Sequence, residues 1–321
     1  MIEQNDISFI VCGRIEPVTK KGLKSIRKYF PHSKIILSTW DDCKIDNLTG
    51  LYDVLVINNA DQIPNKDIKC SVDPHNPKIN SLNLQMSSVH AGLKKSKTLY
   101  SVRFRTDFVL KNANFLRVYN KLNSFLGKRK QEFKLFSQKI LVPTVYTRDP
   151  EKCGGGYAYD VSDIFAFGKT EDLLKRWNGI MVGRESLEYF GSPSEKPNYF
   201  NPHSSNSQYT MEQYGLINLL KDSSINVPLP NSYMDNTDVN FIKNTYEIFL
   251  SNFYIVSLKT LGISSKFSRS DKKDLCLFRY HKYLQLYQKF FPQNNFQLKV
   301  ALIKEDIIEA FKNLFKKGRK K

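Results

Sequence analysis

The sequence predicts an α/β fold with a mixed sheet flanked by helices, and two observations lead to this prediction. First, the apolar runs at 7–15 and 33–40 show no polar alternation, which is typical of buried parallel strands. Second, the segment between them carries apolar residues at helical spacing. A strand, a helix and a second parallel strand form a right-handed crossover. The N-terminal third is therefore predicted to be half of a Rossmann-type sheet.

The elements of this third continue in the same alternation. The connecting helix is predicted over 19–30 and a third buried strand over 52–58. Residues 59–80 are rich in Asn, Asp, Pro and Lys, and a loop of this length is usually functional. A second helix is predicted over 81–97, and it leads into a fourth strand at 99–107.

The fourth strand carries charged side chains at every second position. Arg103, Arg105 and Asp107 therefore share one face. A solvated strand face with an ion pair is one interpretation. A ligand site is the other, because the first, second and fourth strands are expected to end at the same edge, where open α/β sheets bind ligands.

The rest of the chain is less regular. A strand is predicted at 139–147, and a glycine-rich loop at 153–169 runs into another. Residues 189–210 are rich in Ser, Asn and Pro and are interpreted as an extended loop or lid. A helix follows, with Thr210 as its N-cap. From about residue 240 onward the apolar periodicity indicates helices or mixed structure.

The charge of the chain indicates an anionic partner. Its 321 residues include 49 Lys and Arg against 31 Asp and Glu, a net charge of +18. Nucleic acid, an anionic membrane or a phosphorylated substrate would each suit this charge. No apolar stretch approaches the roughly 20 residues of a spanning helix, and the N-terminus lacks a signal-peptide pattern. A cytoplasmic protein is expected. The five scattered cysteines indicate neither a disulfide framework nor a zinc site.

Four segments carry a resemblance to a known family: GRI after the first strand, SIRKYFPHSKIILSTWDD, GLKKSKT and FRTDFVL. Together they resemble the WavE lipopolysaccharide-synthesis family, regarded as glycosyltransferases of surface polysaccharide assembly. The resemblance covers roughly residues 7–112. The later segments VSDIFAFGK and MEQYG fit it more loosely.

The resemblance implies a fold of the GT-A type, in which a nucleotide-sugar lies over the carboxyl edge of the sheet. It also implies a D-x-D motif that holds Mg²⁺ or Mn²⁺ on the diphosphate. Asp107 takes the last position of that motif, as the single metal ligand, and Arg105 takes the first. Arg105 could instead contact the diphosphate directly. Gln85 is a further donor-binding candidate, although Leu84 precedes it where the family has arginine.

The strand ends hold the other candidates for donor binding, among them Asp41 or Asp42, which would hydrogen-bond ribose hydroxyls or serve as turn residues. Gly13 would let the backbone approach the nucleotide, and Arg14 would meet a phosphate or stay solvated. Thr39 and Trp40 would flank the base or ribose, with core packing as the alternative for Trp40.

Two carboxylates are candidates for the catalytic base. Asp163 precedes an apolar strand, and Glu212 opens the helix after the expected lid. Glu212 is favoured, since a helix start beside a loop can face both substrates. The alternative for Glu212 is a helix-dipole role. His203 and His281 are minor candidates for an additional metal ligand.

The expected organisation has two parts. Residues 1–240 form a GT-A-like domain, with 1–112 as the nucleotide-sugar half and 113–240 as the acceptor half. Residues 241–321 form a helical C-terminal extension. Its last segment, 304–321, has an apolar stripe and a basic flank. Such a helix either docks on the core or adsorbs to an anionic leaflet, and we expect the membrane.

These inferences lead to one expected function and two alternatives. We expect an inverting glycosyltransferase that moves a sugar from a nucleotide-diphosphate sugar to a lipid-linked, lipopolysaccharide or capsule glycan. We expect it at the inner face of the cytoplasmic membrane. A nucleotidyl- or phosphotransferase could use the same sheet, but no phosphate-binding glycine motif is present. A nucleic-acid-binding protein would fit the charge, but no recognised binding module is present.

Overall fold

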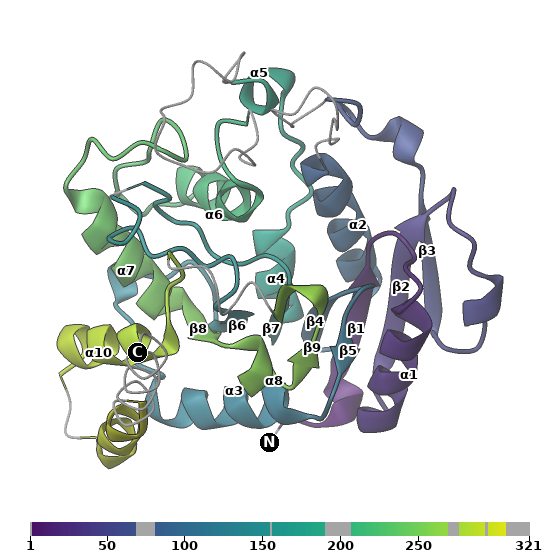
Figure 1. Ribbon diagram of the computed structural model, residues 1–321, viewed down its shortest axis with the longest axis horizontal. Coiled ribbons are helices and arrows are strands. Elements are labelled where there is room, and N and C mark those ends of the chain that lie inside the picture. Colours follow the sequence, from purple (N-terminus) through teal and green to yellow (C-terminus); the bar gives the residue numbers. More distant parts are fainter. Residues whose placement is uncertain are drawn as a thin grey trace, which may run out of the picture.

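The computed structural model describes residues 2–68, 81–154, 156–189, 207–268, 276–292 and 295–305. These residues contain a seven-stranded sheet flanked by helices (Figure 1). The strand order is β3-β2-β1-β4-β7-β6-β8. The predicted mixed α/β sheet of Rossmann type is confirmed.

The N-terminal half supplies four parallel strands. Its elements are β1 (Ile7–Cys12), α1 (Thr19–Tyr29), β2 (Lys34–Trp40), β3 (Val54–Asn58), α2 (Leu82–Lys95) and β4 (Tyr100–Arg105). Strand β1 pairs with β2 and β4, and β2 pairs with β3, all in parallel. Every residue of β1 is buried, as expected for a strand covered on both faces. Strand β4 ends at Arg105, so Asp107 lies in the turn beyond it.

The second half completes the sheet with strands of mixed direction. Its strands are β5 (Val109–Leu110), β6 (Ile140–Pro143), β7 (Ala166–Lys169), β8 (Phe253–Val256) and β9 (Ile263–Ser264). Its helices are α3 (Asn114–Phe125), α4 (Thr170–Arg176), α5 (Arg184–Leu187), α6 (Met211–Lys221), α7 (Asn240–Asn252), α8 (Leu258–Leu261) and α10 (Tyr280–Phe290). Strand β7 runs antiparallel to β4 and β6, and β8 is parallel to β6. Strands β5 and β9 form a small antiparallel sheet.

The main sheet continues past the boundary that we expected between 240 and 241. Helix α7 leads directly into β8, which is an edge strand of the sheet. Strand β9 then pairs with β5, which lies in the earlier part of the chain. Residues 240–264 are therefore part of the same α/β unit, and the helical extension is limited to later residues.

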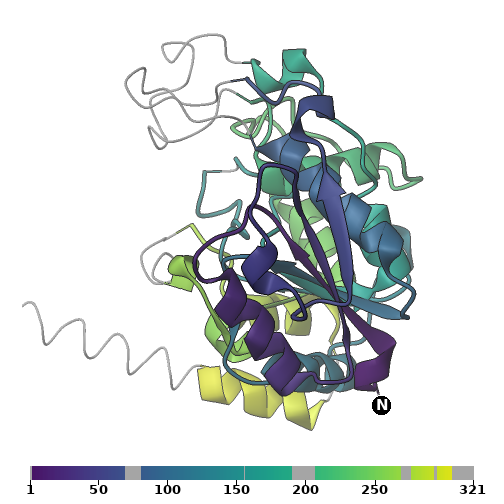
Figure 2. The same cartoon turned by 90° about the vertical axis from the view of Figure 1, so that its right-hand side faces the viewer.

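Helices α1 and α2 cover opposite faces of the sheet, seen from its β3 edge in Figure 2. On the α1 face, aromatic rings form the core: the Phe9 and Phe30 centroids are 5.1 Å apart, and so are those of Phe30 and Phe115. On the α2 face, Gly92 permits a close approach. A Cβ at this position would lie 2.4 Å from Ile10 Cγ2, so the helix could not pack at this depth with a larger residue.

The last described residues are helical. Helix α10 packs against α7 and β8. Lys139, which directly precedes β6, is buried, and its ammonium lies 4.7 Å from the centre of the Tyr287 ring of α10. Burial lowers the pKa of this lysine well below its usual value. Residues 296–305 form another helix, in which Leu298 is buried. Within the described ranges, no helix combines the length and apolar character needed to cross a membrane.

Candidate functional site

The loop after β1 is held in a fixed conformation at the carboxyl edge of the sheet. Gly13 has φ of +124°, a conformation that favours glycine. Its carbonyl accepts a hydrogen bond from the Thr39 hydroxyl at 2.9 Å, and its N–H donates to the Ser38 carbonyl at 3.1 Å. The Thr106 hydroxyl donates to the Arg14 carbonyl at 2.6 Å. Side chains and backbone from the ends of β2 and β4 thus position the loop.

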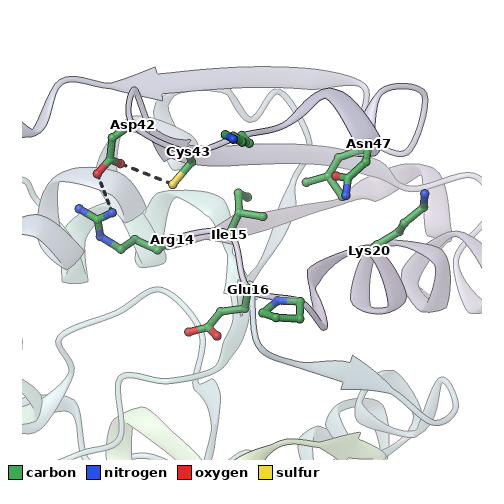
Figure 3. A pocket seen from close by; sticks show the side chains of 10 residues that line it. Arg14, Ile15, Glu16, Lys20, Asp42, Cys43 and Asn47 are labelled. Atoms are coloured by element: carbon green, nitrogen blue, oxygen red, sulfur yellow. Dashed lines mark hydrogen bonds and ion pairs between the residues drawn. The ribbon is translucent and has the colours of Figure 1, made fainter.

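A pocket of about 400 Å³ opens beside this loop (Figure 3). It is lined by Arg14, Ile15, Glu16, Pro17, Lys20, Asp42, Cys43, Lys44, Asn47 and Leu48. Arg14 donates to Asp42 at 2.7 Å across its rim, and this hydrogen bond lowers the pKa of the Asp42 carboxyl. The pocket is therefore lined by both charged and apolar side chains, at the ends of β1 and β2.

Thr39 and Trp40, expected to flank a base or ribose, do not line this pocket. Thr39 is fully buried, and Trp40 is only 4% exposed. Thr39 acts on the pocket indirectly, by its hydrogen bond to the Gly13 carbonyl. Arg14, in contrast, lines the pocket as expected.

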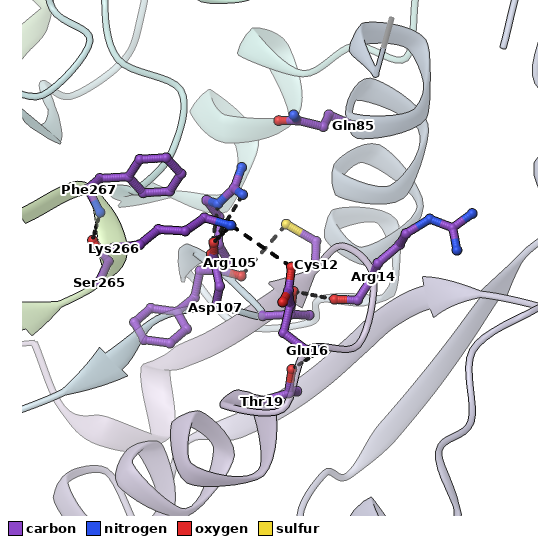
Figure 4. A network of polar contacts seen from close by, with 12 residues as sticks. Cys12, Arg14, Glu16, Thr19, Gln85, Arg105, Asp107, Ser265, Lys266 and Phe267 are labelled. Carbon is purple, nitrogen blue, oxygen red and sulfur yellow. Dashed lines mark hydrogen bonds and ion pairs between the residues drawn. The ribbon is translucent and has the colours of Figure 1, made fainter. Parts of the chain in front are cut away.

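A network of cations surrounds Asp107 at the end of β4 (Figure 4). Arg105 donates to both oxygens of Asp107, from Nε at 2.9 Å and from Nη2 at 3.3 Å. Lys266 Nζ lies 3.2 Å from Asp107 Oδ2 and 4.0 Å from Glu16 Oε1. Burial alone would raise the pKa of Asp107, but the hydrogen bonds and charges of Arg105 and Lys266 outweigh it and lower that pKa. Asp107 is therefore a carboxylate at neutral pH.

Arg103 forms a second ion pair behind this network, and it is buried. Its Nη2 donates to Asp163 Oδ2 at 3.3 Å and to Gln85 Oε1 at 3.1 Å. Only 1% of its side chain is exposed. The interpretation of a solvated strand face is therefore wrong for this arginine. Gln85, expected to contact the donor, binds Arg103 and orients it.

Asp163 is positioned by another buried arginine. Arg176, at the end of α4, donates to the carbonyls of Val161 and Ser162 at 2.9 and 2.8 Å. These hydrogen bonds hold the backbone just before Asp163. The ion pair with Arg103 then fixes the Asp163 carboxylate from the other side.

Glu212 lies in the first turn of α6, close to two other carboxylates. Thr210 is the N-cap of this helix, as predicted, and it forms a capping box with Gln213. Its hydroxyl also donates to Asp160 at 2.8 Å. The pKa of Glu212 is raised well above its usual value, mainly by burial and then by the charges of Asp163 and Asp160. The two predicted candidates for the base, Asp163 and Glu212, are thus brought together.

The charges of both the carboxylates and the cationic network act on Tyr146. Burial raises the pKa of its hydroxyl, and the charges of Glu212, Arg105 and Asp163 also act on it. Its φ is +61°, which is uncommon for a residue with a side chain of this size. The backbone here is held in a strained conformation by its surroundings, which is frequent at functional sites.

A family model described as WavE lipopolysaccharide synthesis matches residues 7–316. The chain belongs to this family. The match extends the resemblance from roughly the first third to nearly the whole chain, including the carboxylates near α6. Among curated proteins, no match was found. Membership in the WavE family indicates an enzyme of lipopolysaccharide synthesis.

The metal that the resemblance implies does not fit the donor set at Asp107. Both carboxylate oxygens already accept from Arg105, and Lys266 lies beside one of them. A divalent ion would bring further positive charge next to these two cations. Among the described residues, no group of three or more His, Cys, Asp or Glu side chains could hold a metal ion.

Some expectations for this WavE chain concern residues outside the described ranges or in α10. His203, most of the expected lid and residues 306–321 of the basic tail lie outside the described residues. His281 lies in α10, which packs against α7 and β8.

Sequence reasoning did not identify Lys266, Glu16 or Tyr146. Lys266 follows β9, and the pairing of β9 with β5 brings it next to Asp107. A contact of this sequence separation leaves no local signal. The positive φ of Tyr146 likewise has no signature in its residue type.

Proposed function

We propose that this WavE protein is a glycosyltransferase that moves a sugar from a nucleotide-diphosphate sugar to a lipid-linked or lipopolysaccharide glycan. One observation carries the proposal: a pocket, a cationic network and a carboxylate of raised pKa occur together around one edge of the sheet. Sugar transfer needs each of them, as room for a nucleoside, positive charge for a diphosphate and a base for the acceptor hydroxyl.

In this proposal the donor extends from the pocket to the end of β4. The nucleoside occupies the pocket between the loops that follow β1 and β2, where open α/β sheets bind ligands. The diphosphate then lies toward Arg105 and Lys266, since Glu16 belongs both to the pocket wall and to the cationic network.

Glu212 acts as the general base in the proposed reaction. The acceptor hydroxyl gives its proton to the Glu212 carboxylate while its oxygen attacks the anomeric carbon. A raised pKa makes the Glu212 carboxylate a stronger base than an ordinary Glu. Because the oxygen attacks from the side opposite the leaving diphosphate, the anomeric configuration is inverted.

The first test is a panel of donors with the purified protein. We expect saturation-transfer nuclear magnetic resonance to detect binding of at least one nucleotide sugar among UDP-, GDP- and ADP-sugars, and mass spectrometry to detect sugar transfer from that donor to a lipid-linked glycan. Binding of no nucleotide sugar, by protein that is folded by circular dichroism, would contradict the proposal.

The same proposal puts the enzyme at a membrane surface. In the helix at 296–305, Phe296 is 77% exposed and Ile303 is 59% exposed, while Leu298 faces the core. Phe296, Val300 and Ile303 are spaced to share one helix face. Exposed Lys299 and Lys304 flank it. An apolar face with basic neighbours suits the surface of an anionic bilayer, where the lipid-linked acceptor would lie.

Serine in place of Phe296 is expected to weaken binding to phosphatidylglycerol vesicles by about tenfold, because burial of a large apolar side chain contributes roughly 1.5–3 kcal/mol. Vesicle flotation measures this change. The matched control is Val239→Ser, which alters a residue that is 88% exposed elsewhere on the protein. Equal binding of both variants would contradict a membrane role for the exposed face.

A further inference from the structure

We propose that Arg105 and Lys266 hold the diphosphate of the donor directly, with Asp107 as their positioning residue and without a divalent metal. This inference rests on the proposed function, because it concerns the donor of that reaction. It differs from the expectation of a metal on Asp107, and the geometry around this residue carries it.

The exposure of the three side chains is the first argument. Asp107 is only 5% exposed, whereas Arg105 is 22% and Lys266 60% exposed. A ligand that approaches from solvent therefore meets the two cations before the carboxylate. Such a surface is suited to an anion.

The orientation of Arg105 is the second argument. Asp107 binds its Nε and Nη2, and the guanidinium stacks over the Phe267 ring at 5.1 Å. Among the described residues, none accepts a hydrogen bond from its Nη1. A planar guanidinium held in this way is ready to donate to phosphate oxygens and loses little conformational freedom on binding.

Lys266 is brought to this position by the fold. In the small sheet, Val109 of β5 pairs with Ser264 of β9, and the Lys111 N–H donates to the Gly262 carbonyl at 2.7 Å. These contacts join the segment before Lys266 to the segment after Asp107. The lysine is therefore a built part of the network, although it lies far from Asp107 in sequence.

The charges also allow an anion to bind. Asp107 is buried between the two cations and neutralises part of their charge. Glu16 is the other carboxylate of the network, but it is 46% exposed and 4.0 Å from Lys266, so water and salt screen it. A diphosphate that displaces this weak contact gains two charge-assisted partners.

The two cations would act on the leaving group. As the acceptor oxygen forms its bond to the anomeric carbon, the bond from that carbon to the diphosphate oxygen breaks, and its electron pair stays on the diphosphate. The added negative charge lies next to Arg105 and Lys266, which stabilise it. The proton of the acceptor passes to Glu212, so the step needs no further reactant.

Calorimetric titration with pyrophosphate, UDP, GDP and ADP tests the inference, in EDTA and in Mn²⁺. We expect binding in EDTA, a similar affinity in Mn²⁺, and weakening at high salt. Lys266→Ala and Arg105→Gln should each weaken binding about ten- to a hundredfold, the range for a charge-assisted hydrogen bond. Lys259→Ala is the matched control, since Lys259 is an exposed lysine of α8 outside the network.

Two results would overturn the inference. One is binding that requires Mn²⁺ and disappears in EDTA, and the other is a Lys266→Ala variant that binds as tightly as Lys259→Ala. The proposed function fails separately: pyrophosphate binding that depends on Lys266, without sugar transfer from any donor, would support the cation pair and contradict the glycosyltransferase. Sugar transfer that requires a divalent metal would support the glycosyltransferase and contradict the metal-free cation pair.

Discussion

Glutamine in place of Glu212 is expected to lower the rate of sugar transfer by about 10²–10⁴-fold, the usual contribution of a general base. The substitution keeps the size of the side chain and replaces its titratable carboxylate with a neutral amide that cannot accept the proton. Donor binding should change little, because the reaction assigns Glu212 to the acceptor. Single-turnover transfer and donor titration, measured on the same variant, separate these two effects.

The proposed role of Glu212 also predicts how the transfer rate changes with pH. A base must be deprotonated, so the rate of the wild-type enzyme should rise with pH until it passes the raised pKa of Glu212. The Glu212→Gln variant should lack this rising limb. A residue that only capped α6 would not produce such a difference in the pH–rate profile.

As the pH rises, the free energy of unfolding should fall while the rate of sugar transfer rises. The folded protein raises the pKa of Glu212 and so keeps its proton to a higher pH than the unfolded chain does. The stability contributed by this group is therefore lost as the pH rises from the ordinary pKa of Glu through the raised one. Since glutamine does not titrate, Glu212→Gln should unfold at a higher urea concentration than the wild type at neutral pH.

The helix-dipole alternative for Glu212 predicts that Glu212→Gln is less stable than the wild type and transfers sugar at the wild-type rate. Loss of a favourable charge in the first turn of α6 would cost about 0.3–1 kcal/mol of stability and leave transfer intact. Glu185→Gln is a matched control, because Glu185 is an exposed glutamate in the first turn of α5. Transfer by Glu212→Gln at the rate of Glu185→Gln would contradict the assignment of the base.

The fold could be predicted wherever the local pattern specified both the element and its direction. The segments at 7–15, 33–40 and 52–58 each contain a strand, because continuous apolar runs alternate with a helical period. After residue 240 the pattern left open whether helices alone or a mixture of helices and strands would follow. There α7 runs without a break into β8 within one apolar stretch, in which periodicity alone does not separate a helix from a buried strand.

The site could be predicted only in part, for a related reason. The strand-end rule brought together Gly13, Arg14 and Arg105, because parallel strands share one carboxyl edge. It gave no information on burial, so Trp40 was assigned to a ligand surface that it does not reach. Lys266 depends on the pairing of β5 with β9, which the sequence pattern does not reveal.

Replacement of Arg103 by methionine is expected to destabilise the protein by about 3–5 kcal/mol, the usual cost of removing one partner from a buried ion pair. The variant leaves the Asp163 carboxylate without its cation in a nearly solvent-free site. It also removes the donor to Gln85 Oε1. Urea unfolding, followed by circular dichroism at fixed pH, measures the loss. Arg27→Met is a control on a half-exposed arginine that pairs with Asp53.

The double variant Arg103→Met/Asp163→Asn separates structure from catalysis. If the pair is structural, removal of both charges should recover most of the lost stability, because no uncompensated charge then stays buried. If Asp163 only positions Arg103, Asp163→Asn should keep the rising limb that Glu212 produces, with a lower amplitude and at lower pH, because the Asp163 charge no longer raises the pKa of Glu212. Loss of the rising limb in Asp163→Asn, together with its retention in Glu212→Gln, would exchange the two roles and make Asp163 the base. The strand that carries Arg103 and Arg105 would then still serve both purposes: its buried arginine would orient the catalytic carboxylate, and its partly exposed arginine would face the donor.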